Sequence, residues 1–352
     1  MKVTSPRRAE VDLAALRRNV ARLRARLPEQ TRFIAVVKAD GYGHGARQVA
    51  QAALAAGAEM LAVVTLDEAE ELRDLVERPE RILVLGPTPG AADFALACTS
   101  PEQAEALIAS GRPVAIHLEV DTGMTRYGVD PEAAASIARR LVESGVRLAG
   151  TWTHLAGADS DPEFTREQLR RYEAALSRFD VSPGLRHAAN SAGVLNHPDA
   201  AYDAVRVGIA MYGCEGGAAL EPVLALRAPI TRLRRVGEGT AVGYGSTWRA
   251  PRESLIATVG IGYADGVHRA RSNRGFCLVR GVRAPLVGRV SMDSLTLDVT
   301  EVAEVACGDA VTLIGADGAE RITAEEVAAW SETISYEVLT AIGRRVERVY
   351  AD

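Results

Sequence analysis

Short apolar segments alternate with helical patterns through the first two-thirds of the chain, and this alternation constrains the fold more than any other feature. There are eight such segments, at residues 33–37, 61–64, 82–85, 94–98, 114–120, 148–154, 185–189 and 204–209. Helical spacing of apolar residues fills several of the intervals, for example 131–143 and 162–179. Parallel strands need crossover connections, and eight such units close a sheet on itself. The pattern therefore predicts an α/β fold with an N-terminal (β/α)8 TIM-like barrel, and an open, doubly wound sheet is the competing arrangement.

The pattern changes in the last third of the chain. Leu224, Leu226 and Ala228 alternate with other residues, as in a strand with one buried face. Short β-like segments follow between glycines, at 254–261, 276–279, 295–299 and 310–314. Thr323 and Glu326 form a capping box that predicts a closing helix. These features predict a C-terminal mostly-β domain.

The change of pattern also suggests the domain boundaries. We expect the barrel to occupy residues 11–222. The second domain should comprise 223–352 together with 1–10, which should add one strand to it.

Composition and charge narrow the classes of function. The chain has 352 residues, 25% of them charged, with a net charge of −5, which gives no reason to expect nucleic acid or an anionic membrane as partner. Its four cysteines are scattered, so neither a zinc site nor disulfides are expected, and no metal is predicted. No segment resembles a signal peptide or is long enough to span a bilayer. A cytoplasmic protein is the expectation.

A lysine follows the first barrel strand. Lys38 comes directly after five apolar residues and before a loop containing Gly41, Gly43 and Gly45. The carboxyl ends of barrel strands are where ligands bind, and burial would lower the pKa of such an amine and prepare it to form an imine. A salt-bridged or solvent-reaching lysine is the alternative. The glycine spacing is GxGxG, which does not match the dinucleotide fingerprint and weighs against a nicotinamide dehydrogenase.

Other residues with polar side chains or accessible backbone amides are expected at the same end of the barrel. These are Tyr42, Glu119, Asp121, Arg126, Tyr127, His154, Asn190, Ser191, Arg206, Gly208 and Ile209. Barrels often bind phosphate in the last two loops, and here these loops offer the Ser191 hydroxyl and the backbone amides of Gly208 and Ile209. A lysine suited to an imine together with a phosphate site indicates pyridoxal 5'-phosphate as cofactor.

Arg206 is the candidate partner for the pyridine nitrogen of that cofactor. A carboxylate would keep the nitrogen protonated and make the ring a strong electron sink. An arginine does not give up its proton, so the nitrogen would stay neutral. This favours a reaction in which a proton leaves and returns over decarboxylation or transamination. A structural salt bridge inside the barrel is the other role open to Arg206.

Eight short motifs are similar to those of alanine racemases and occur in the same order as in that family. They are AVVKADGYGHG, VDTGMTRYGV, WTHLAGAD, HAANSAG, VRVGIAMYG, VGIGYADG, GRVSMD and ISYEVLTAIGRR. Together they span nearly the whole chain. The resemblance implies a cofactor-binding barrel, a C-terminal β-domain and a head-to-tail homodimer. The implied activity is the interconversion of L- and D-alanine, the latter for peptidoglycan.

The resemblance also implies roles for individual residues. Lys38 matches the cofactor-binding lysine and one of two catalytic bases, and Tyr263 matches the opposite base, supplied by the other subunit. Bases on both faces are what racemisation needs. A hydrogen-bonded chain of tyrosine, histidine and arginine corresponds to Tyr263, His154 and Arg206. For His154 alone, a satisfied core histidine would otherwise be the simpler interpretation.

The remaining matched residues surround the cofactor and the substrate. The phosphate shell corresponds to Tyr42, Ser191, Gly208, Ile209 and Tyr336, with Asn190 beside it. Arg126 matches the arginine near the phenolic oxygen of the cofactor and the substrate carboxylate. Met292 and Asp293 match partner-subunit residues that shape the substrate pocket.

One position departs from the family pattern. Where this chain has Glu119, many family members have a lysine that is carbamylated to gain a negative charge. Glu119 carries that charge in its own side chain, so we expect it to pair with Arg126 and to remove any need for carbon dioxide. A solvated ion pair is the alternative.

Other functions of this fold fit the sequence less well than racemisation of alanine. Barrel decarboxylases of basic amino acids use an acidic partner for the ring nitrogen and a cysteine in the donated loop, where this chain has Arg206 and Val290–Asp293. A non-catalytic carrier of the cofactor would lack the second domain and Tyr263. A racemase of broader specificity, for example for serine, is the other function that the sequence allows.

Overall fold

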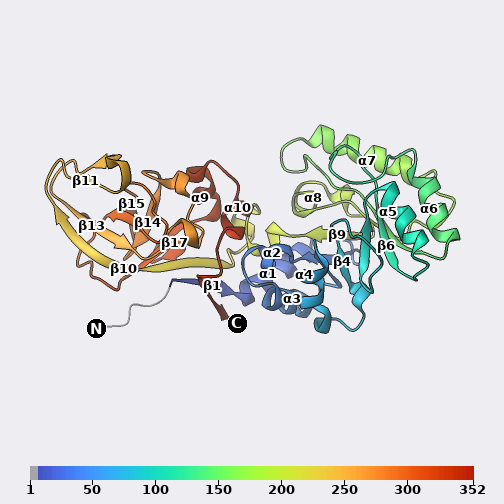
Figure 1. Cartoon of the computed structure of the whole chain (residues 1–352), viewed down its shortest axis with the longest axis horizontal. Helices are drawn as coiled ribbons and strands as arrows, with labels where there is room; N and C mark the ends of the chain where they lie inside the picture. Colours follow the sequence, from blue (N-terminus) through green and yellow to red (C-terminus); the bar gives the residue numbers. More distant parts are fainter. Residues whose placement is uncertain (1–6) are drawn as a thin grey trace. The chain divides into compact units, whose positions relative to one another are not determined.

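The computed structural model describes residues 7–352 (Figure 1). The chain forms two compact units. One, the barrel unit, comprises residues 16–41 and 46–220. The other, the β unit, comprises the described residues up to 15, residues 42–45 and residues 221–352. Each unit is described by itself.

The barrel unit contains eight parallel strands that close into a barrel. The strands are β2 (Arg32–Val36), β3 (Met60–Val63), β4 (Ile82–Val84), β5 (Ala95–Cys98), β6 (Ala115–Glu119), β7 (Arg147–Trp152), β8 (Leu185–His187) and β9 (Ala204–Val207). They pair in sequence order, and β9 pairs with β2 to close the ring, with Arg32 opposite Ala204. The predicted (β/α)8 barrel is confirmed, and the open sheet is excluded.

Helices connect the strands of the barrel unit. They are α1 (Leu13–Arg24), α2 (Lys38–Tyr42), α3 (Ala46–Ala55), α4 (Leu66–Glu71), α5 (Pro101–Ala109), α6 (Ala134–Glu143), α7 (Pro162–Leu176) and α8 (Ser191–Asn196). Single 3-10 turns are η1 (Arg73–Leu75), η2 (Pro79–Arg81), η3 (Pro198–Ala200), η4 (Ile209–Tyr212) and η5 (Gly217–Ala219). Side chains of Ser100 and Asp161 accept hydrogen bonds at the starts of α5 and α7, each followed by proline at the first helical position.

The sequence also predicts where the helix after β3 starts, and this prediction was wrong. The spacing of Asp67 and Glu70 suggests a capping box, but the box in the structure is Thr65 with Glu68, two residues earlier. The Glu68 carboxylate accepts the N–H groups of Val64 and Thr65, which places it at the third helical position. Asp67 lies inside the first turn, where a negative charge is favourable.

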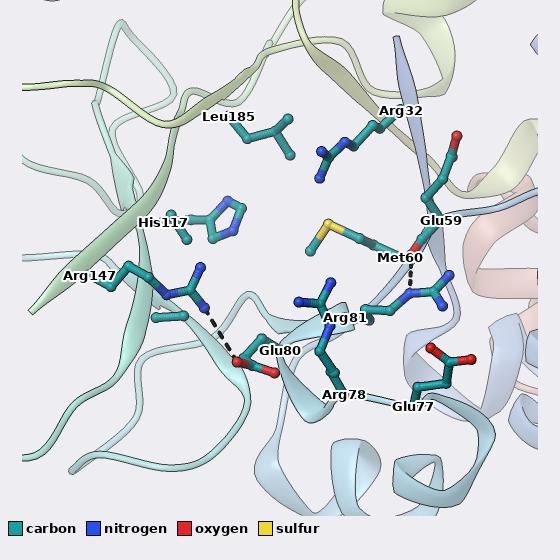
Figure 2. A pocket seen from close by; sticks show the side chains of 12 residues that line it. Arg32, Glu59, Met60, Glu77, Arg78, Glu80, Arg81, His117, Arg147 and Leu185 are labelled. Atoms are coloured by element: carbon teal, nitrogen blue, oxygen red, sulfur yellow. Dashed lines mark hydrogen bonds and ion pairs between the residues drawn. The ribbon is translucent and has the colours of Figure 1, made fainter. Parts of the chain in front are cut away.

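The two ends of the barrel carry different residues. The first residues of five strands, Arg32, Met60, Ala115, Arg147 and Leu185, line a cavity of about 440 Å³ at the amino-terminal end (Figure 2). The polar residues expected to carry the chemistry follow the carboxyl ends of the strands. The barrel unit therefore has two separate polar ends.

The β unit is built on a nine-stranded sheet, as the predicted mostly-β domain requires. Its strands are β1 (Arg8–Asp12), β10 (Leu224–Val236), β13 (Ser254–Val259), β14 (Phe276–Val279), β15 (Val282–Pro285), β16 (Leu295–Asp298), β17 (Ala310–Asp317), β18 (Glu320–Ile322) and β19 (Glu347–Ala351). The unit also contains a hairpin of two short strands, β11 (Ala241–Val242) and β12 (Trp248–Arg249). Its helices are α9 (Ala324–Ser331) and α10 (Ser335–Thr340), and its 3-10 turns are η6 (Tyr244–Ser246), η7 (Tyr263–Asp265) and η8 (Arg269–Arg271).

Strand β1 lies between β10 and β19, antiparallel to the first and parallel to the second. Part of the segment expected to add a strand, residues 1–6, lies outside the described residues. The predicted capping box of Thr323 and Glu326 does open helix α9.

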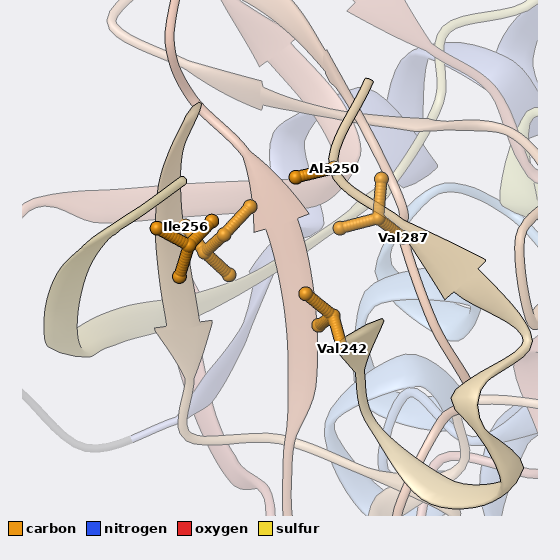
Figure 3. Packing of buried hydrophobic residues seen from close by; sticks show 5 residues of the cluster. Val242, Ala250, Ile256 and Val287 are labelled. Carbon is orange, nitrogen blue, oxygen red and sulfur yellow. The ribbon is translucent and has the colours of Figure 1, made fainter. Parts of the chain in front are cut away.

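Apolar side chains from β10, the hairpin, β13 and the segment after β15 pack together in the β unit. Val236, Val242, Ala250, Ile256 and Val287 are all buried and form one cluster (Figure 3). Burying a valine or isoleucine side chain contributes about 1.5–3 kcal/mol. Through Val236, the last residue of β10, the cluster anchors the end of that strand, beyond the register shift between Ile230 and Arg232.

Candidate active site

Lys38 opens a left-handed turn at the carboxyl end of β2. Ala39, Asp40 and Gly41 all have positive φ, at 52°, 53° and 60°. A left-handed conformation costs a residue with a side chain roughly 1–2 kcal/mol, so contacts from elsewhere must hold it. The Ala39 N–H donates to Glu68 (2.7 Å), and Asp40 Oδ1 accepts the Ala46 N–H that begins α3 (2.9 Å). Strained backbone of this kind concentrates at functional sites.

The turn holds the amine of Lys38 in a half-buried position. Desolvation lowers the pKa of Lys38, and the positive charge of Arg126 lowers it further, against the opposing effect of Glu68. A lysine with a lowered pKa has a larger neutral fraction near pH 7, and the neutral amine is the form that attacks a carbonyl group.

Arg206, on β9, is buried at 3% exposure and is surrounded by acceptors. Its Nη1 donates to Nδ1 (2.8 Å) and to the carbonyl oxygen of His187 (3.1 Å). Its Nη2 donates to the carbonyl oxygens of Thr153 (2.8 Å) and Ala188 (3.1 Å) and lies 3.4 Å from Nδ1 of His154. The Nε–H of Arg206 donates no hydrogen bond to any of residues 7–352, whereas both of its Nη groups do. Burial lowers the pKa of Arg206 to about 10, still well above neutral.

The guanidinium of Arg206 determines which nitrogen of each neighbouring histidine carries a proton. Burial first, then Arg206, lowers the pKa of His154 to about 3 and that of His187 well below its usual value, so both rings are neutral. A guanidinium only donates, so each Nδ1 is an acceptor and each proton is on Nε2. His187 Nε2 then donates to Nδ1 of His117 (2.8 Å), and His154 Nε2–H is available to a further acceptor.

Trp152, at the end of β7, supports this group from one side. The guanidinium carbon of Arg206 lies 4.5 Å from the centre of the Trp152 ring, a cation–π contact. The same ring is nearly parallel to His187, at 7° and 5.8 Å between centroids. The sequence assigns no role to Trp152, His187 or His117.

Glu119, at the end of β6, is 3% exposed, and its Oε2 has no hydrogen-bond partner. Desolvation raises the pKa of Glu119 to about 7, although the charges of Arg206 and Arg126 lower it. No hydrogen bond or ion pair joins Glu119 to Arg126 in the described part of the chain, so the expected pair stays a prediction. Arg126 is exposed and lies 5.8 Å over the ring of Tyr127.

The loops after β8 and β9 meet at Ser191. Its hydroxyl oxygen accepts hydrogen bonds from the backbone N–H groups of Gly208 (3.0 Å) and Ala210 (3.3 Å). Two N–H groups that converge in this way also suit an anionic oxygen. The Asn190 side chain is engaged nearby, accepting the Gly193 N–H (2.9 Å) and donating to the Leu155 carbonyl oxygen (3.2 Å). Ile209 is buried at the start of η4. The predicted phosphate-binding residues of the barrel unit therefore lie together.

Two of the predicted site residues in the β unit, Tyr42 and Tyr336, pack with their rings 6.0 Å apart. The neighbouring Gly43 lies so close to helix α10 that an added Cβ would be 2.2 Å from the Leu339 carbonyl oxygen. Only glycine fits there, which explains one glycine of the loop after Lys38.

Tyr263, Met292 and Asp293 lie together on another part of the β unit. The Tyr263 N–H donates to the Ser291 carbonyl oxygen (3.0 Å), and Asp293 pairs with Arg345 (2.6 Å). The side chains of Tyr263 and Met292 are 43% and 52% exposed. Large apolar groups exposed at a surface are suited to contact with another molecule.

Among residues 7–352, no group of histidine, cysteine and acidic side chains is placed to hold a metal ion. None of the described helices has the length and hydrophobicity to cross a membrane.

These features define a barrel enzyme with a desolvated lysine, a buried arginine and an anion-accepting pair of loops. The sequence matches the family profile "Alanine racemase, N-terminal domain" over residues 11–216 and "Alanine racemase, C-terminal domain" over 223–350. An alanine racemase from Desulfovibrio desulfuricans is 42% identical, covering 98% of each chain. The chain belongs to the alanine racemase family.

Solved structures agree with this assignment. The crystal structure of alanine racemase from Bacillus anthracis with bound L-Ala-P superimposes with a TM-score of 0.91 at 37% identity, covering 100% of this chain and 96% of that one. Alanine racemase from Bartonella henselae, with covalently bound pyridoxal phosphate, gives 0.90 at 29% identity, covering 99% and 100%.

Proposed function

We propose that this protein interconverts L- and D-alanine with bound pyridoxal 5'-phosphate, using Lys38 and Tyr263 as bases on opposite faces of the substrate. The observation that carries the proposal is Arg206, which is buried, protonated and held by five acceptors, with its Nε–H left for one more. That donor suits a ring nitrogen that keeps its lone pair.

The residues of the chain fit the cofactor. The Lys38 amine would attach to its carbonyl carbon, and the Ser191 hydroxyl with the amides of Gly208 and Ile209 would hold its phosphate, alongside Asn190. Tyr42 and Tyr336 would complete the phosphate shell. When bound, the cofactor supplies a conjugated ring that acidifies the α-proton of an attached amino acid. Because Arg206 does not release its proton, a ring nitrogen facing it would stay unprotonated, and this would favour return of a proton over decarboxylation.

Tyr263, the second base, needs a neighbour that stabilises its phenolate form, because tyrosine ordinarily has a pKa near 10. His154 can meet this need because its Nε2–H is free to donate to a phenolate oxygen, while its Nδ1 is held near Arg206. Tyr263 and Met292 are exposed on the β unit, and we propose that both enter the site of a second copy of the chain in a homodimer. Asp293 would hold the substrate pocket from the same copy, and Arg126 would bind the substrate carboxylate.

The direct test follows each L-amino acid in deuterated water by optical rotation and α-deuteration. Racemisation that prefers alanine, without carbon dioxide or pyruvate, supports the proposal, and equal rates with serine would indicate a broader racemase. Release of carbon dioxide would indicate a decarboxylase, and cofactor binding without deuteration a carrier. The proposed role is the supply of D-alanine for peptidoglycan in the cytoplasm.

Replacing Glu119 by glutamine should lower racemase activity yet stabilise the protein at alkaline pH. Because its carboxyl pKa is raised from 4.5 to about 7, wild-type stability falls as pH rises through that interval, and at pH 8 the loss amounts to about 3 kcal/mol at most. Glutamine removes this loss, so the melting temperatures of the two proteins should differ at pH 8 and converge near pH 4.5.

Added bicarbonate tests whether the Glu119 carboxylate replaces a carbamylated lysine. Wild-type activity should not respond to added bicarbonate, because the carboxylate needs no carbamate. Stimulation of the wild type by bicarbonate would contradict this. A melting temperature that falls in Glu119→Gln at pH 8 would show instead that pairing with Arg126 stabilises the ionised carboxylate by more than its burial costs.

Trp152→Leu should reduce kcat/KM by about tenfold, because a buried cation–π contact is worth up to about 2 kcal/mol and its loss frees Arg206 to tilt. Trp152 acts here as a positioning residue. The variant should keep covalent attachment at Lys38 but shift the pH dependence of kcat, since His154 is oriented by the same guanidinium. Trp152→Phe, which keeps an aromatic face, should recover most of the activity. An unchanged pH profile in Trp152→Leu would argue for a packing role only.

A further inference from the structure

The hydrogen-bond direction set by Arg206 continues to the opposite end of the barrel. His187 donates from Nε2 to Nδ1 of His117, so the proton of His117 is on its own Nε2. His117 is only 2% exposed, yet it lines the amino-terminal cavity, and its ring points into that cavity (Figure 2). Its Nε2 makes no hydrogen bond to any residue between 7 and 352. A nearly buried N–H donor aimed into a cavity requires an acceptor there.

Three arginines converge on the same space. Arg32, Arg78 and Arg147 all extend into the cavity from different sides (Figure 2). Neither Arg32 nor Arg78 forms a hydrogen bond or ion pair through its guanidinium in the described chain, although Arg32 attracts Asp203 at longer range. Arg147 makes one loose ion pair, 3.5 Å from Glu80, and both side chains are largely exposed.

The acids of the lining do not neutralise this charge. Glu59 is already bound, by Arg24 (2.9 Å) and by the N–H of Phe33 (2.7 Å). Arg81 uses its Nε on the backbone oxygen of Glu59 and keeps its charge. Glu77 is thus the one lining carboxylate without a cationic partner in this part of the chain, whereas Arg32, Arg78 and Arg81 all lack an anionic partner there. The cavity is electropositive, and the charge of Arg147 adds to the desolvation that lowers the pKa of His117 to about 3.

We propose that this cavity binds a small phosphate ester, whose phosphate group accepts hydrogen bonds from His117 Nε2–H and from the guanidinium groups of Arg32, Arg78 and Arg147. Arginine forks match phosphate oxygens. The volume of about 440 Å³ falls within the range of small-molecule sites, roughly 300–1,000 Å³, so there is room for the organic part of an ester. Met60 and Leu185 offer it an apolar wall.

The proposed site is separate from the loops proposed to hold the cofactor. Arg32 and Arg147 are the first residues of β2 and β7, whereas Ser191 and Gly208 follow the last residues of β8 and β9. Parallel strands in a closed barrel place their first and last residues at opposite ends. The inference therefore does not depend on the proposed racemase activity.

Calorimetric titration of the cofactor-loaded protein at constant ionic strength tests the site. Glycerol 3-phosphate should bind saturably, once per chain, inorganic phosphate more weakly, and glycerol not at all. Loaded protein is used so that the cofactor already fills its own phosphate loops. Arg32→Gln/Arg78→Gln should weaken binding at least tenfold while leaving racemisation unchanged.

A matched control removes the same charge elsewhere. Arg166 and Arg178 are exposed, do not line the cavity and have no ion pair among the described residues. Arg166→Gln/Arg178→Gln should bind glycerol 3-phosphate like the wild type. If it weakens binding as much as the cavity variant, the effect is general electrostatic attraction and the proposal is overturned.

A second variant fills the cavity without changing charge. Ala149 lines it, and Ala149→Phe should abolish binding of glycerol 3-phosphate, with circular dichroism confirming the fold. Absence of saturable binding to wild type, or wild-type affinity in either cavity variant, would overturn the assignment.

Discussion

Replacing Lys38 with alanine should abolish racemisation and covalent attachment of the cofactor together, lowering kcat/KM by at least about 10⁴-fold. Two functions are lost at once, the nucleophile that attaches the cofactor and one of the two bases. The burial that lowers the pKa of this amine is specific to its position at the end of β2, so no neighbouring group can replace it.

The composition of the chain makes this test unusually clear. The sequence contains only two lysines, Lys2 and Lys38. After borohydride reduction of the loaded protein, mass spectrometry should find one pyridoxyl group, on the peptide that contains Lys38. Lys2→Arg serves as the control and should retain full activity and labelling. A pyridoxyl group on Lys2 of the wild type, or α-deuteration of alanine by Lys38→Ala at more than a trace rate, would contradict the role given to Lys38.

The sequence predicts the barrel well because each of its strands gives the same local pattern, a short apolar segment between helical patterns. Eight apolar segments at regular intervals indicate eight strands, and each strand end then identifies a polar residue by its place alone. Lys38, Glu119, His154 and Arg206 were all found in this way, without any knowledge of their contacts. Their placement at strand ends in the structure follows from the same periodicity.

The left-handed turn after Lys38 could not be predicted in the same way. Nothing local favours positive φ at Ala39, and the conformation depends on Glu68, 29 residues further along the chain. The same carboxylate explains why the predicted start of α4 was wrong, because Glu68 serves the turn and the cap together. A local pattern cannot reveal a side chain that is shared between two segments.

The buried network around Arg206 was also beyond sequence reasoning. His187 and His117 each occur singly on an apolar strand, a pattern equally compatible with simple packing. They become part of one directed chain only because barrel closure brings β6, β8 and β9 together around a common interior. The motif letters WTHL show Trp152 beside His154, but its position beneath Arg206 depends on the orientation of β7.

Arg206→Lys keeps the positive charge but should lower kcat/KM by about 10²-fold or more and destabilise the protein by about 3 kcal/mol. An ammonium group cannot reach all the acceptors that the two Nη atoms satisfy, so Nδ1 of His187 and the carbonyl oxygens of Thr153 and Ala188 compete for fewer donors. Each buried acceptor left unpaired costs about 1–3 kcal/mol. Loss of a fixed donor at a reacting group typically costs 10²–10³ in rate.

The neighbouring strand supplies the control for this substitution. Arg186, on β8, pairs with Asp203 at 2.8 Å where both side chains are about two-fifths exposed. This pair is also forked, with Nε and Nη2 each donating to one carboxylate oxygen. Because it is exposed to solvent, its loss should cost only about 1 kcal/mol, so Arg186→Lys should lower the melting temperature slightly and leave kcat/KM unchanged. If Arg206→Lys behaved like this control, charge alone would suffice and the forked geometry would have no role. If it loses activity and stability as expected, the fixed shape of the guanidinium is what satisfies the buried acceptors, orients His154 and presents the Nε–H.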